Sequence, residues 1–169
     1  LVDPLDGTKE FIKKNDEFTV NIALIYKDEP VLGVVYAPAL DLCYWAKKSE
    51  GAFKDGKILP LKTLDQCKTY KIVVSRSHMS YETQVFIDAI DTQKEKELIS
   101  TGSSLKICLV AEGEADIYPR FGSTMEWDTG AAHAIIKEAG KNLEQYNGMK
   151  YEPLLYNKEN LLNHWFVAK

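Results

Sequence analysis

The first third of the chain carries a series of short β-strand patterns, and this series constrains the possible folds more than any other feature of the sequence. Residues 18–26 (FTVNIALIY) alternate and then become continuously apolar, whereas residues 30–38 (PVLGVVYAP) are rich in β-branched residues and end at a proline. Residues 41–61 continue the series and contain Asp55-Gly56, a strong signal for a two-residue hairpin turn. Strands joined by such short connections predict an antiparallel meander.

The rest of the chain alternates between strand and helix patterns. The patterns indicate strands over residues 71–77, 98–102, 115–121 and 164–168, helices over 81–90, 103–115 and 126–140, and a hairpin over 143–152 that turns at Asn147-Gly148. Ser103 or Ser104 is the expected N-cap of the second helix, and Gly140 is expected to end the third.

The order of these patterns predicts an α+β fold that passes into α/β, with the change near residues 62–70. We therefore expect the remainder of an N-terminal antiparallel-sheet domain over residues 1–65 and a C-terminal α/β domain over residues 66–169. The chain has 169 residues, of which 45% are hydrophobic, so it can bury one sizeable core or two small ones.

Charge and composition exclude several classes of protein. The formal net charge of -4 argues against general binding to nucleic-acid polymers or membrane surfaces, which requires a basic face. The three cysteines are widely spaced and form no CxxC pair, which is typical of reduced thiols in a cytosolic protein. The three histidines are equally scattered, so a zinc site is not expected. No stretch approaches the roughly 18 apolar residues of a membrane span.

The chain opens on the motif DPLDGT. Pro4 restricts the backbone, so that the carboxylates of Asp3 and Asp6 can converge on one point. Two such carboxylates suit Mg²⁺, which binds carboxylates, water and substrate phosphate. Gly7 would let the backbone approach a phosphate, with the Gly7 and Thr8 amides as donors. An acidic turn that caps the next element is the alternative, and this motif alone does not decide between them.

A second motif, EWDTGAAH, places Asp128 in the first turn of the predicted helix over residues 126–140. An aspartate in this position is commonly a helix cap, and the motif alone favours that role. The small residues at 129–132 support a functional role, because they would let the helix start press close to another backbone and share a metal ion.

Two further stretches carry basic and hydroxyl side chains. Ser103, Ser104 and Lys106 lie at a helix start, which is suited to anions, and Arg120 ends a strand. A capped helix with surface charges is the alternative for this stretch. The stretch SRSH, at residues 75–78, places an arginine and His78 at the expected domain junction, and the local pattern leaves their roles open.

Together these motifs resemble the inositol monophosphatase superfamily of metal-dependent, lithium-sensitive phosphatases. DPLDGT and WDTGAAHAIIKEAG occur in the order that this family has them. Within the superfamily, the chain resembles the bisphosphate nucleotidases of the bacterial CysQ type. The stretches that carry this resemblance are LVDPLDGTKEFI, EFTVNIALI, SRSH and GSSLKICLVAEGEADIYPRFG. The resemblance implies the layered α/β sandwich of the sugar phosphatases, here lacking its N-terminal part. It also implies Mg²⁺-dependent hydrolysis of the 3′-phosphate of adenosine 3′,5′-bisphosphate to AMP and phosphate.

Carried over to this sequence, the resemblance implies a role for each motif residue. It implies that two or more Mg²⁺ ions are bound by Asp3, Asp6, Asp128 and the carbonyl oxygen of Leu5. It further implies that Gly7 and Thr8 hold the scissile phosphate, that the Thr8 hydroxyl helps to orient the attacking water, and that the nucleotide is bound by His78, Ser103, Lys106 and Arg120. The implied partner is therefore a small nucleotide bisphosphate in the cytoplasm, and association with the inner membrane face stays open.

The sequence departs from the family pattern in two places. Its second motif has DTGAAH where many family members have DTAAGH. Family members also have a segment ahead of the first motif, with a glutamate that binds metal, and we expect the 169 residues to be a truncated form with little activity by themselves. Two other functions stay open, namely hydrolysis of an inositol or sugar phosphate and an inactive fragment that only binds metal or nucleotide.

Overall fold

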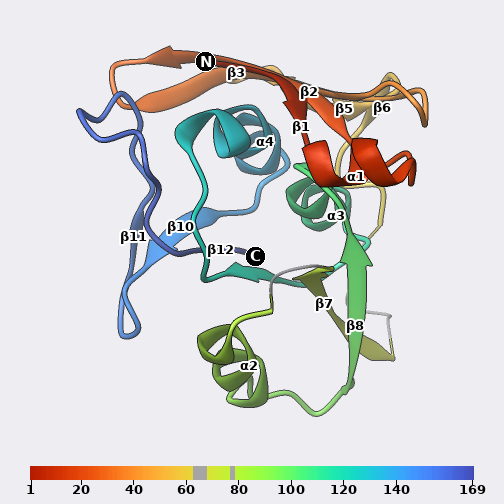
Figure 1. Ribbon diagram of the computed structural model, residues 1–169, viewed down its shortest axis with the longest axis vertical. Helices are drawn as coiled ribbons and strands as arrows, with labels where there is room; N and C mark the ends of the chain where they lie inside the picture. Colours follow the sequence, from red (N-terminus) through yellow and green to blue (C-terminus); the bar gives the residue numbers. More distant parts are fainter. Residues whose placement is uncertain (63–67, 77–78) are drawn as a thin grey trace.

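An antiparallel sheet of six strands forms one layer of the computed structural model, which describes residues 1–62, 68–76 and 79–169 (Figure 1). Its strands follow one another in chain order and are β1 (Val2–Asp6), β2 (Thr19–Tyr26), β3 (Glu29–Ala37), β4 (Leu42–Lys47), β5 (Gly51–Lys54) and β6 (Lys57–Ile58). The predicted meander is therefore confirmed, including the two-residue turn at Asp55-Gly56 between β5 and β6. Between β1 and β2 lies a short helix, α1 (Thr8–Lys13), which was not expected from the sequence.

The second part of the chain forms two smaller sheets and three helices. The parallel pair β7 (Thr69–Ser75) and β8 (Glu95–Thr101) makes one sheet. The other sheet has the order β11-β10-β12-β9, with β9 (Tyr118–Arg120), β10 (Leu143–Tyr146), β11 (Tyr151–Pro153) and β12 (Phe166–Ala168). The helices are α2 (Tyr81–Asp88), α3 (Leu105–Glu112) and α4 (Glu126–Glu138).

Most of these elements confirm the sequence patterns, and the differences concern their ends. The strand expected from residue 98 begins at Glu95, and the strand expected over 115–121 is limited to β9. The C-terminal hairpin pairs β10 with β11 as expected. The left-handed backbone of Gly140 (φ 80°) lies just beyond the end of α4, as the sequence predicted.

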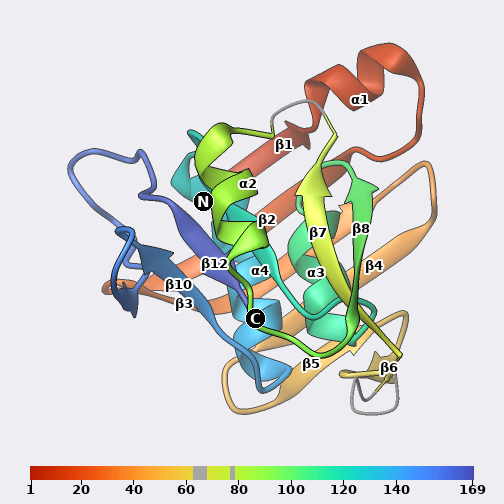
Figure 2. The same cartoon turned by 90° about the horizontal axis from the view of Figure 1, so that it is seen from below.

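Helix α4 packs across one face of the six-stranded sheet, with α3 beside it (Figures 1 and 2). The side chains of Ala23, Val35, Ala46 and Ala52 on this face are buried. The contact is very close at Gly33 of β3, because a Cβ atom there would lie 2.2 Å from the carbonyl oxygen of Ala131. The small residues at the start of α4 thus let the helix approach the sheet backbone.

The division into residues 1–65 and 66–169 stays a prediction. Its boundary falls partly on residues 63–67, which lie outside the described residues. The main apolar core contains buried side chains from both sides of that boundary, among them Tyr44 of β4 and Ile135 of α4. None of the helices that the structure describes has the length and apolarity needed to cross a membrane.

Candidate active site

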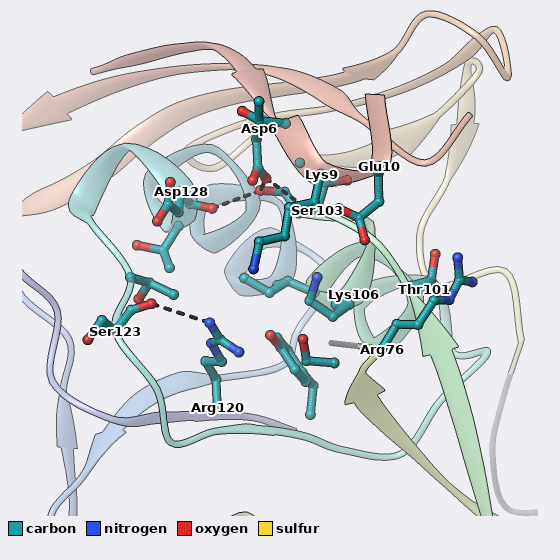
Figure 3. A pocket seen from close by; sticks show the side chains of 18 of the residues that line it. Asp6, Lys9, Glu10, Arg76, Thr101, Ser103, Lys106, Arg120, Ser123 and Asp128 are labelled. Atoms are coloured by element: carbon teal, nitrogen blue, oxygen red, sulfur yellow. Dashed lines mark hydrogen bonds between the residues drawn. The ribbon is translucent and has the colours of Figure 1, made fainter. Parts of the chain in front are cut away.

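A cleft of about 860 Å³, including its open mouth, lies where α1, α3, α4 and the ends of β7, β8 and β9 meet (Figure 3). Most of the side chains that the sequence singled out line the cleft, namely Asp6, Gly7, Thr8, Ser103, Ser104, Lys106, Arg120 and Asp128. His78 cannot be placed among them, because it lies outside the described residues.

The strand β1 is irregular at the point where it carries its two aspartates. In a regular strand Asp3 and Asp6 would point to opposite faces, because successive side chains alternate. Asp3 pairs with Asn21 and Asp6 pairs with Thr19, so two residues of β1 lie opposite a single residue of β2. Such a bulge changes the direction of the following side chain. In addition, Asp3 Oδ1 accepts a hydrogen bond from the Leu5 amide at 3.0 Å.

Asp128 comes from the opposite side of the site, in the first turn of α4. Its carboxylate accepts a hydrogen bond from the amide of Met125 at 2.7 Å, so it caps the helix as the sequence suggested. Its carboxylate also lies close to the two aspartates of β1. One carboxylate oxygen from each of Asp3, Asp6 and Asp128 lies within 4.8 Å of the other two, so the three could hold one metal ion. The cap and the metal-ligand role proposed for Asp128 are therefore compatible.

The electrostatics of this acidic cluster favour a bound cation. Burial and, to a smaller extent, the neighbouring charges of Asp6 and Asp3 raise the pKa of Asp128 to about 6. Burial also raises the pKa of Asp3. Three carboxylates brought this close repel one another when ionised, and a hard divalent cation with oxygen ligands relieves that repulsion. The donor set thus fits Mg²⁺.

The connection from β1 into α1 forms the upper rim of the cleft. Gly7 has φ 86°, and a Cβ atom there would lie 3.3 Å from both the Glu17 carbonyl oxygen and Ser103 Cβ. Glycine is therefore required by both the backbone conformation and the lack of space. The Thr8 hydroxyl donates to the carbonyl oxygen of Leu5 at 3.3 Å, which places it directly beside the acidic cluster.

Two basic side chains, Lys106 and Arg120, line the part of the cleft opposite Asp6 and Asp128 (Figure 3). Burial lowers the pKa of Lys106 to about 8, and the nearby charge of Asp6 opposes this effect. Arg120 donates to the carbonyl oxygen of Ser123 at 3.3 Å, while its buried Nε has no partner among the residues that the structure describes. Lys106 is therefore a partly buried side chain that faces the cleft, and not the exposed surface charge that the sequence left open as an alternative.

Other residues of the cleft were missed or left open by the sequence. Arg76, whose role was open, lines the cleft and pairs with Glu17 at 3.0 Å. Lys9 and Glu10 of α1 line it as well, although no local pattern marked them. A helix predicted over residues 8–13 would have placed Lys9 and Glu10 in the turn that directly follows the motif. The segment is too short, however, to show a clear helical period.

The two serines before α3 correct one expectation. Ser104 occupies the N-cap position, but its side chain makes no capping bond with α3. Its hydroxyl lies 2.7 Å from Asp6 Oδ2 instead. Ser103 has the left-handed φ of 48°, and its buried hydroxyl has no hydrogen-bond partner in the described part of the chain. Both serines therefore line the cleft, and neither hydroxyl group caps α3.

Comparisons with known proteins show the family of the chain. A model of the inositol monophosphatase family matches residues 1–165. The 3′(2′),5′-bisphosphate nucleotidase CysQ of Escherichia coli (strain K12) is 45% identical over 167 residues, which is 98% of this chain and 65% of that protein. The corresponding protein of Shigella flexneri is 46% identical, again over 98% of this chain and 65% of its own length. The chain thus spans about two thirds of these relatives.

Solved structures show the same fold. The crystal structure of CysQ from Bacteroides thetaiotaomicron, a bacterial member of the inositol monophosphatase family, superposes with a TM-score of 0.91 at 48% identity, covering 99% of this chain and 68% of that one. Inositol monophosphatase II from Staphylococcus aureus gives 0.80 at 24% identity, covering 99% and 63%, which supports the fold alone. The expected layered α/β sandwich is confirmed.

Proposed function

Because the chain belongs to the inositol monophosphatase family, we propose that the protein is a magnesium-dependent phosphatase that removes the 3′-phosphate of adenosine 3′,5′-bisphosphate, giving AMP and phosphate. The names of the relatives support the nucleotidase activity, since they are 3′(2′),5′-bisphosphate nucleotidases. The observation that carries the proposal is a cleft in which Asp6 and Asp128, two of the three clustered carboxylates, lie opposite the cations Lys106 and Arg120. A substrate with two separate phosphate groups matches such a division.

The acidic end of the cleft is the proposed site of hydrolysis. Asp3, Asp6, Asp128 and the Leu5 carbonyl oxygen are the proposed ligands of two or more Mg²⁺ ions. Bound Mg²⁺ supplies charge neutralisation at the phosphate and lowers the pKa of a coordinated water. The Thr8 hydroxyl, which lies next to the Leu5 carbonyl, is placed to orient that water.

The protein groups around the acidic end position the reacting phosphate. The Gly7 and Thr8 amides are the proposed donors to its oxygens, and the close packing of Gly7 against Glu17 and Ser103 holds them in place. Asp128 lies in the first turn of α4, which begins at Glu126. The positive end of the helix dipole would therefore also face the anionic substrate.

The basic side of the cleft is the proposed site of the second phosphate. Lys106 and Arg120 come from α3 and β9 and both line the cleft. Ser103 lines it as well, and its buried hydroxyl has no hydrogen-bond partner among the residues that the structure describes. Charge-assisted hydrogen bonds to phosphate are stronger than neutral ones, so these groups would distinguish a bisphosphate from a monophosphate. His78 stays a proposed nucleotide contact. A small nucleotide in the cytoplasm is the proposed partner.

The proposal is tested by comparing two substrates. Phosphate release by the full-length enzyme is measured with adenosine 3′,5′-bisphosphate and with inositol 1-phosphate, in Mg²⁺ and in EDTA. We expect the nucleotide to have the higher kcat/KM and activity to disappear in EDTA. A preference for the inositol ester would favour the inositol phosphatase alternative, and nucleotide binding without turnover in Mg²⁺ would favour a binding protein.

A second test uses the acidity of Lys106. Its pKa of about 8 means that the side chain is mostly cationic at about pH 7 and mostly neutral at about pH 9.5. We therefore expect the KM for adenosine 3′,5′-bisphosphate to rise over this range. Lys106→Met should raise the KM about tenfold or more at neutral pH, as expected for the loss of a charged hydrogen bond, and should remove the rise with pH.

Lys106→Arg provides the matched control, because a guanidinium stays protonated throughout this range. It should show a flatter pH profile than the parent protein. A KM that is the same in the parent and in Lys106→Met would exclude a contact between Lys106 and the substrate.

A further inference from the structure

One oxygen of Asp6 is surrounded by hydrogen-bond donors. The Ser104 amide and the Ser104 hydroxyl each lie 2.7 Å from Asp6 Oδ2. The side-chain amide of Asn21 lies 3.2 Å from the same atom, and the Thr19 hydroxyl lies 3.4 Å from it. Thr19, Asn21 and Ser104 are at most 3% exposed. Oδ2 is therefore fully used within the protein, which leaves Oδ1 as the oxygen available to a cation.

The same donors connect Asp6 to Asp128. The Asn21 side-chain amide donates to Ser104 Oγ at 2.9 Å, and Ser104 Oγ lies 2.8 Å from the backbone carbonyl oxygen of Asp128. The single hydroxyl proton of Ser104 can be given to Asp6 or to this carbonyl, while Asn21 supplies a proton from the other side. Ser104 thus lies between two of the three carboxylate-bearing segments.

Two local features of Ser103 and Ser104 are energetically unfavourable in this arrangement. Ser104 lacks the side-chain capping bond that a serine in its position commonly makes. The preceding residue, Ser103, has φ 48°, a left-handed conformation that is unfavourable for a non-glycine residue. Unfavourable local features of this kind concentrate at functional sites, where the surrounding structure maintains them.

From these contacts we propose that Ser104 and Asn21 are positioning residues of the metal site. Their hydrogen bonds occupy Oδ2 of Asp6, so that only Oδ1 is available to a cation. They also fix the distance between Oδ1 and Asp128. The inference rests on the metal site of the proposed function and extends it to two residues that would not touch the ion. Partners that orient a metal ligand in this way usually affect metal affinity by 10–100-fold.

The test measures binding of Mn²⁺, which accepts the same oxygen ligands as Mg²⁺ and is observed directly by electron paramagnetic resonance. The parent chain is compared with Ser104→Ala, Asn21→Ala and the double variant. We expect each single variant to weaken Mn²⁺ binding about tenfold. The double variant should lose less than the sum of the two, because both residues act through one oxygen of Asp6.

Ser80→Ala is the matched control. Its hydroxyl accepts from the Thr83 amide and caps α2, away from the carboxylates. This variant should lose thermal stability, measured without metal, while its Mn²⁺ affinity stays at the parent value. A role of Ser104 in stability alone would lower the unfolding temperature of Ser104→Ala in the same way and leave its affinity unchanged.

The outcomes separate this inference from the proposed function. If the parent chain binds no Mn²⁺, the proposed metal site is wrong and the inference falls with it. If the parent binds Mn²⁺ and both single variants bind it equally well, only the positioning role is overturned. Circular dichroism confirms that each variant is folded, and Asn21→Ala decides the question should Ser104→Ala fail to fold.

Discussion

In the complete enzyme, Asp128→Asn should reduce turnover of adenosine 3′,5′-bisphosphate by more than about 100-fold while leaving the fold intact. The amide keeps an oxygen that can accept the hydrogen bond from the Met125 amide, so the first turn of α4 stays capped. It loses the negative charge that a proposed Mg²⁺ ligand requires. Loss of an outer partner of a ligand already costs 10–100-fold, and loss of the ligand's charge should cost more. Steady-state kinetics at saturating Mg²⁺ measure the effect.

The same substitution should stabilise the metal-free protein at neutral pH. Burial raises the pKa of Asp128 to about 6 from its ordinary value of 3.8, so the folded state binds the proton more tightly than the unfolded state. Stability therefore falls as the pH rises from about 4 to about 6, and the loss persists above that range. Asparagine does not ionise, so its stability advantage should be absent near pH 4 and complete near pH 7.5.

Thermal unfolding at these two pH values, with and without Mg²⁺, provides the measurement. Mg²⁺ should raise the unfolding temperature of the parent and have little effect on Asp128→Asn. Glu138→Gln, at the other end of α4, is the control and should retain turnover, since Glu138 accepts from the amides of Ser49 and Gly51. Parent-like turnover or Mg²⁺ stabilisation in Asp128→Asn would remove Asp128 from the metal site.

The strands and helices with a long, regular pattern could be predicted from the sequence. The meander of β2 to β6 and the helix α4 are clear because each has a hydrophobic period or a specific turn signal, such as Asp55-Gly56. The short elements were harder. The helix α1 has only six residues, and its N-cap, Gly7, makes no side-chain capping bond. Its position is instead set by packing around Gly7, which involves Ser103, far along the chain.

The acidic cluster could be proposed from motifs, but the way it is built could not. The convergence of Asp3 and Asp6 depends on the bulge between β1 and β2, and Pro4 marks a restricted backbone there without specifying the bulge. The role of Ser104 depends on a bond to Asp6 across 98 residues of chain. A local pattern favours a helix cap for such a serine, because only the tertiary fold brings the carboxylate close enough to compete for its hydroxyl.

Gly33→Ala should be the most destabilising single-methyl change in the sheet that supports the site. The added Cβ would lie 2.2 Å from the Ala131 carbonyl oxygen and 2.9 Å from the Ala131 Cα. These are backbone atoms, so relief requires moving α4 away from β3, and that movement would open the buried layer that contains Val35 and Ile135. We expect a loss of about 3 kcal/mol or more in the free energy of unfolding, at the upper end of the range for overpacking.

Gly130→Ala separates this effect from the general cost of a larger residue in the same interface. A Cβ at Gly130 would meet only side-chain atoms, at 3.2 Å from Ala23 Cβ and 3.3 Å from Leu1 Cδ1. Alanine also gains up to about 1 kcal/mol of helix propensity over glycine, so the net change should be small. Urea unfolding of both variants provides the comparison. Equal stability of the two would mean that α4 can shift on the sheet, in which case the position of Asp128 depends on its own contacts and not on the closeness of α4 to β3.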